Sequence, residues 1–147
     1  MSECATAEEM RKALMDILSS KTDYAIVLRH RAAKIIHCGK QPTSIADGEN
    51  YINSFENVSA AIRRTACRFL VDTFSNKNII LPKIYTHGDN ITFSWEKSEG
   101  ELLILFGESH YDIYKCYKGI VVTNRHISYS GGDNAEFSGI KKFLEES

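Results

Sequence analysis

The spacing of apolar residues changes near residue 79 of this chain. Before that point apolar side chains recur every three or four residues, which is the period of an amphipathic helix, and Met10, Leu14 and Ile17 are an example. After it they alternate with polar side chains, which is the period of a half-buried strand. Helices followed by consecutive strands predict an α+β domain with an antiparallel sheet.

Two long helices are predicted before the period changes. The first covers about residues 7–20, and Thr6-Ala7-Glu8-Glu9 fits a capping box at its start. The second covers 57–75, where Asn57 or Ser59 can cap the first turn. Its apolar stripe consists of Val58, Ile62, Ala66, Phe69, Leu70 and Phe74.

The segments between these helices are less regular. Residues 22–39 fit either a helix or two short strands, and a helix is favoured because no turn-forming residues interrupt the middle. Residues 39–56 are rich in Gly, Asn, Asp and Ser, which predicts a linker. The whole chain is therefore expected to form a single domain, with an N-terminal helical segment (1–40) and a helix-plus-sheet core (57–147).

The rest of the chain is predicted to form four to five strands joined by short turns, an antiparallel meander. The strand over 79–85 contains Pro82, which lacks a backbone donor, so this strand lies at an edge or starts late. A fifth strand over 120–129 has a kink near Asn124, and a short helix over 135–146 closes the chain. One face of the sheet is expected to carry the helices, and the other to meet water or a partner.

Trp95 is expected to be buried. It shares a strand face with Ile91 and Phe93, and these side chains need the helix carrying Phe69 and Leu70 as cover.

Five segments occur in an order that resembles a known group of domains. They are Ala66-Cys-Arg-Phe-Leu70, Leu81-Pro-Lys-Ile84, Gly88-Asp-Asn-Ile-Thr-Phe-Ser-Trp-Glu96, Leu102-Leu-Ile-Leu105 and Ile140-Lys-Lys-Phe-Leu144. This order is similar to that of small uncharacterised bacterial and phage domains, although the turn here is Gly-Asp-Asn instead of Asp-Gly. The resemblance covers a little over half the chain and implies a fold, not an activity. It also implies an accessory protein of a mobile element, of the anti-CRISPR kind, that binds another protein.

Charge and composition argue against several classes of protein. The net charge is −1, whereas a general nucleic-acid binder is usually basic. The polar, acidic N-terminus is not expected to act as a signal peptide, and no apolar run approaches the roughly 18–20 residues of a membrane span. A cytoplasmic location with reduced cysteines is expected.

The sequence contains no decisive catalytic or metal motif, because both CxxC and HExxH are missing. Cys67 lies on the apolar side of a predicted helix and Cys116 on a predicted strand, where free cysteines are usually small core residues. A small hydrolase that uses Cys116 and His110 is the weakest functional hypothesis. No enzyme activity, cofactor or metal site is predicted.

The preferred partner-binding residues lie on the late strands, where aromatic and cationic side chains alternate. They are Tyr114, Lys115, Tyr117, Lys118 and Arg125, and they are open to three interpretations: core packing, protein contact, or stacking on nucleic acid.

The alternative location is the basic segment 21–40, through Arg29, Arg31 and Lys34, whose simpler interpretation is a solvated helix face. The leading hypothesis is a non-enzymatic protein-binding module that inhibits a host protein, such as a defence nuclease complex. The runner-up is a protein that binds RNA or single-stranded DNA through the Tyr/Lys face.

Overall fold

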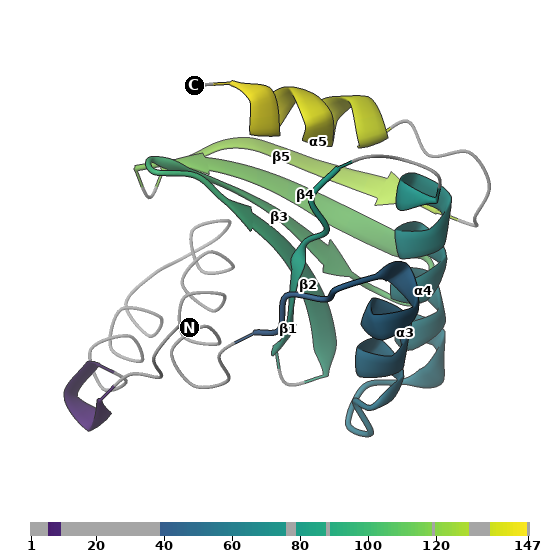
Figure 1. The fold of residues 1–147 in the computed structure, drawn as a ribbon. Helices are drawn as coiled ribbons and strands as arrows, with labels where there is room; N and C mark the ends of the chain where they lie inside the picture. The colour runs from purple at the N-terminus through teal and green to yellow at the C-terminus, as the bar shows by residue number, and fades with distance from the viewer. Residues whose placement is uncertain are drawn as a thin grey trace.

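The computed structural model describes residues 6–9, 39–75, 79–87, 89–118, 120–129 and 136–146. Their elements, drawn in Figure 1, are helices α3 (Ile45–Asn53), α4 (Ala60–Phe74) and α5 (Glu136–Glu145), and strands β1 (Lys83–His87), β2 (Asn90–Glu96), β3 (Gly100–Phe106), β4 (His110–Tyr117) and β5 (Ile120–Ser128). The predicted α+β class is confirmed. Within the described residues, no helix is long and apolar enough to cross a membrane.

The strands form one antiparallel sheet in the order β1-β2-β3-β4-β5, which confirms the predicted meander. Each strand pairs with the next one along the chain, and the connections are only two or three residues long. Figure 1 shows a strongly curved sheet, with α3 and α4 beside one end and α5 over the β4–β5 side.

Helix α3 lies inside the segment that was predicted to be a linker, so that prediction is wrong for residues 45–53. Ser44 caps the helix, because its side chain accepts a hydrogen bond from the Asp47 amide at 3.0 Å. The Asp47 carboxylate accepts from the Thr43 amide at 2.9 Å and from Lys40 Nζ at 3.0 Å, and these bonds lower the pKa of Asp47. The polar residues that suggested a linker therefore cap the first turn of a helix. Ile52 is buried and packs this helix into the core.

The other helix predictions are confirmed where the structure describes them. Ser59 caps α4 by accepting from the Ile62 amide at 3.2 Å. Thr6 accepts from the Glu9 amide at 3.2 Å, as the capping box requires, and residues 7–9 are helical. The remainder of the predicted first helix and the ambiguous segment 22–39 fall almost wholly outside the described residues.

Aromatic rings from α4 and the sheet fill the main core. Phe69 of α4 makes edge-to-face contacts with Phe93, Phe106 and Tyr111, at centroid distances of 6.1, 5.2 and 5.0 Å. Trp95 is 3% exposed, packs against Phe74 and donates from Nε1 to the Ile80 carbonyl at 2.9 Å. The predicted burial of Trp95 is thus confirmed.

The opposite face of the sheet differs from the expectation that it meets water. Six of its side chains are buried, namely Tyr85, Thr92, Ser94, Leu103, Tyr114 and Cys116. Strand β2 accordingly has five consecutive buried residues, 91–95. The uninterrupted apolar run 102–105 of β3 was the sequence signal for burial on both faces.

The two edge strands depart from regular pairing in different ways. Strand β1 begins directly after Pro82, and Lys40 pairs with Ile84 through backbone hydrogen bonds of 3.0 and 2.9 Å. In β5 the irregularity lies at Val122, because Lys115 pairs with Thr123 whereas Cys116 pairs with Val121. The predicted kink near Asn124 thus corresponds to an irregularity two residues earlier in β5.

Replacing Trp95 with alanine is expected to lower the free energy of unfolding by about 3–5 kcal/mol, because the change leaves a cavity in the core. Urea unfolding followed by circular dichroism measures this. Ile80→Ala is the control: its side chain is 67% exposed, so the expected change is within about 0.5 kcal/mol. Equal unfolding midpoints for wild type and Trp95→Ala would contradict the buried placement.

Candidate functional site

Strand β5 is the most exposed strand of the sheet. It is nine residues long, lies at the sheet edge and contains no buried residue. Ile120 and Val122 are 65% and 54% exposed, and with Ile80 they are the large apolar side chains that the described residues expose. A long edge strand with exposed β-branched residues is a ready template for another strand.

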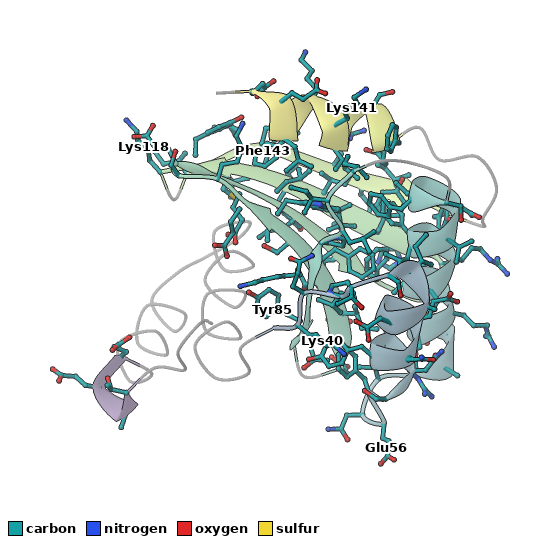
Figure 2. The ribbon with its side chains drawn as sticks, viewed as in Figure 1. Lys40, Glu56, Tyr85, Lys118, Lys141 and Phe143 are labelled. Carbon is teal, nitrogen blue, oxygen red and sulfur yellow. The ribbon has the colours of Figure 1, made fainter. Side chains whose placement is uncertain are left out.

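The β4–β5 turn lies directly before Ile120, at the end of the sheet where β5 begins. Tyr117 pairs with Ile120, which leaves a connection of two residues, and Lys118 adopts a positive φ of 52° there. The Lys118 amide donates to the Glu99 carbonyl at 2.8 Å, which ties this turn to the β2–β3 turn. Figure 2 shows Lys118 at the tip, pointing away from the helices.

The predicted Tyr/Lys surface is divided between the two faces of the sheet. Tyr114 is buried on the face opposite the helices, with Leu103 and Cys116. Tyr117 packs on Phe143 of α5, and its hydroxyl donates to Glu146 at 3.1 Å. Among the predicted residues, Tyr114 and Tyr117 are thus committed to contacts within the chain.

The predicted cationic residues Lys115, Arg125 and Lys118 have different surroundings. Lys115 Nζ lies 5.9 Å from the centre of the Phe143 ring. Arg125 forms an ion pair with the largely buried Glu136 at 2.8 Å. Lys118 is exposed. The alternative residues Arg29, Arg31 and Lys34 lie outside the described residues.

The tyrosines of the late strands do not form one exposed stacking platform. Tyr111 and Tyr114 are buried, and they belong to different faces. Tyr129 packs on Phe69, and its hydroxyl donates to Asp72 of α4 at 2.6 Å, so burial and this bond raise its pKa. The stacking surface that the nucleic-acid hypothesis needs is therefore not assembled from these residues.

The residues of the hydrolase hypothesis are not brought together. His110 and Cys116 are six residues apart on the same strand, a separation of about 20 Å at the rise of a β-strand. Cys67 is half-buried, and its burial raises the pKa of its thiol to about 11. A thiol with that pKa is a poor nucleophile at neutral pH.

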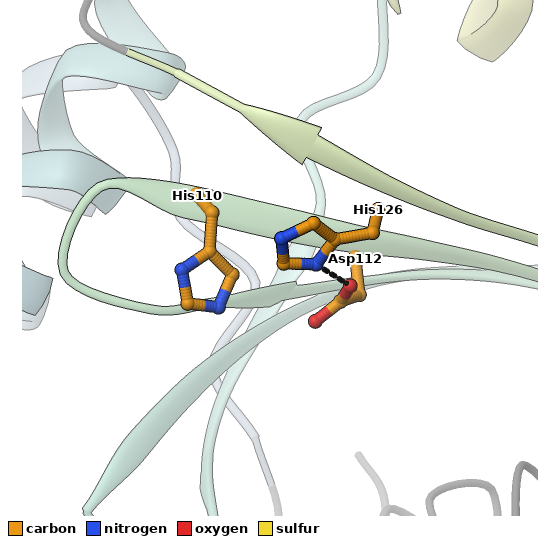
Figure 3. A group of neighbouring side chains, drawn as sticks. All are labelled: His110, Asp112 and His126. Carbon is orange, nitrogen blue, oxygen red and sulfur yellow. Dashed lines mark hydrogen bonds and ion pairs between the residues drawn. The ribbon is translucent and has the colours of Figure 1, made fainter.

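His110 instead lies beside Asp112 and His126 (Figure 3). His126 Nδ1 donates to the Asp112 carboxylate at 2.6 Å, and the centroids of the two imidazole rings are 4.7 Å apart. The sequence interpretation passed over Asp112. The spacing His-x-Asp was the available signal, because residues two apart on a strand share a face.

Comparisons with known proteins give no match. No family model, no curated protein and no solved structure matches this chain.

Alkylation tests the state of Cys67. Iodoacetamide at pH 8 is expected to modify Cys67 in the native chain roughly tenfold or more slowly than in the urea-unfolded chain, because the raised pKa leaves little thiolate. Peptide mass mapping over time measures the two rates. Equal or faster modification of the native chain would contradict the raised pKa of the Cys67 thiol.

Proposed function

We propose that this chain is a non-enzymatic protein-binding module that pairs strand β5 with an extended segment of a partner protein. The observation that carries the proposal is the exposure of β5, an edge strand of nine residues without one buried residue. The separation of His110 from Cys116 along β4 also favours this proposal over a hydrolase that uses these two residues.

The backbone of β5 supports strand addition. Among the described residues β4 is its only neighbour in the sheet, so the outer side of β5 presents backbone donors and acceptors. The register from Thr123 to Ser128 is regular over six residues. An added strand of that length gains main-chain hydrogen bonds from the edge and selectivity from side chains on either face.

The other edge of the sheet is less suited to this role. Strand β1 has five residues and follows Pro82, which has no backbone donor. Lys40 already forms two backbone hydrogen bonds with Ile84. An incoming strand therefore meets fewer obstacles at β5 than at β1.

Side chains at the start of β5 supply the apolar contact. Ile120 and Val122 expose β-branched side chains next to the regular segment, and the burial of each contributes about 1.5–3 kcal/mol to binding. Lys118 adds a positive charge at the tip, which favours an acidic group in the partner. The resemblance to mobile-element domains extends this proposal to inhibition of a host defence nuclease complex.

The double variant Ile120→Lys/Val122→Lys is expected to lose at least about tenfold in affinity for the partner, because two buried apolar contacts are replaced by charges. The partner is first identified by co-purification with the wild-type chain from host lysate and mass spectrometry. Its affinity for each variant is then measured with purified proteins by titration calorimetry.

Ile80→Lys is the matched control, since Ile80 is as exposed as Ile120 but lies next to β1. Ile80→Lys should bind the partner normally, and both variants should keep the wild-type unfolding midpoint. Equal affinities for the double variant and the control would contradict the β5 site. If light scattering shows instead a homodimer that only the double variant dissociates, the occupant of β5 is a second copy of the chain.

A further inference from the structure

We infer that His110, Asp112 and His126 form a binding site for a divalent first-row transition-metal ion, with Zn²⁺ as the best-suited probe. Each residue offers one ligand atom, and these atoms all lie within 4.8 Å of one another. Two imidazoles and one carboxylate are a donor set that zinc and non-haem iron sites use.

Strand geometry places the three side chains together. His110 and Asp112 are two residues apart on β4, so they share a face of the sheet. His126 of β5 pairs directly with Asp112 and lies diagonal to His110. The ligands thus stand on two hydrogen-bonded strands, a more rigid support than a loop.

The irregularity at Val122 creates this register. Tyr117 pairs with Ile120 at the turn, and uninterrupted pairing from there would bring Arg125 opposite Asp112. The extra residue shifts the register by one, so His126 faces Asp112 and Arg125 turns to the other face, where it meets Glu136. Bulges re-aim side chains in this way and are frequent next to functional sites.

The imidazole of His110 is held by its surroundings. Its ring lies over Gly107 in the β3–β4 turn, where a Cβ atom would overlap the ring. Because Gly107 has no side chain, the imidazole of His110 can lie beside that of His126. Figure 3 shows the two rings side by side, with Asp112 next to His126.

The geometry of the three residues requires only small adjustments to hold an ion. Ligand bonds of about 2.0–2.2 Å place the ligand atoms of a tetrahedral site about 3.3 Å apart, closer than 4.8 Å but within reach of side-chain rotation. The 2.6 Å hydrogen bond between His126 and Asp112 would be exchanged for two bonds to the metal. His126 is 63% exposed and Asp112 20%, so an ion has direct access from solvent.

A three-residue site leaves coordination positions open. In zinc proteins a fourth position of this kind holds water or a donor atom of a bound molecule. Metal binding at this site would use side-chain atoms, whereas the proposed pairing with a partner strand uses backbone atoms of β5. The two proposals can therefore be tested separately.

Zinc titration of the full chain, stripped of metal with a chelator, tests the inference. Calorimetry is expected to show one Zn²⁺ ion per chain at this site. His110→Ala, Asp112→Asn and His126→Ala should each weaken binding by about 100-fold or more, beyond the 10–100-fold that loss of a supporting hydrogen-bond partner causes. Co²⁺ should give visible ligand-field absorption without thiolate charge-transfer bands.

His37→Ala and His87→Ala are matched controls, because they remove imidazoles elsewhere in the chain. Both should bind Zn²⁺ like the wild type, and all variants should keep the wild-type unfolding midpoint. Ile120→Lys, which leaves Val122 and the register of β5 unchanged, should also bind Zn²⁺ normally, so failure of the partner-binding proposal is distinguishable from failure of this one. No binding at about 1 mM Zn²⁺, thiolate bands with Co²⁺, or unchanged affinity in the three ligand variants would overturn the inference.

Discussion

The packing of Phe69 is the interaction on which the rest of this structure depends. Its ring meets aromatic rings from β2, β3 and β4 and also Tyr129, so one side chain of α4 links the helix to most of the sheet. Edge-to-face geometry fixes both the distance and the direction of these contacts. Helix α4 packs on β2 and β3, whereas β5 is the last strand of the meander and therefore lies at the edge, with no buried residue.

The same packing explains why the tyrosines of the late strands are poor indicators of a binding surface. A tyrosine combines a large apolar ring with one hydroxyl, and it can be buried where that hydroxyl finds a partner. Tyr129 reaches Asp72 and Tyr117 reaches Glu146, so both rings join helices to the sheet. The excess of tyrosines in this region serves the attachment of α4 and α5, and the exposed residues next to them carry the proposed function.

Strand register connects the two proposed sites. The extra residue at Val122 places Val122 itself in an exposed position, turns Arg125 toward Glu136 and sets His126 opposite Asp112. The proposed partner site and the proposed metal site therefore both include residues that this irregularity in β5 positions. A shift of one residue reverses the face of every later side chain, which is why so small a feature has such wide effects.

The sequence by itself determined what depends on local spacing: the meander, the capped starts of helices, and the burial of Trp95 through its alternation with Ile91 and Phe93. Tertiary structure decided what depends on neighbours far apart in the chain. Residues 45–53 form a helix because Ile52 packs into the core. Tyr114 is buried on the face of the sheet opposite the helices. Tertiary structure also joined His126 to Asp112, because the register between two strands is set by pairing across them and by a bulge at Val122, two residues from the kink that the sequence predicts.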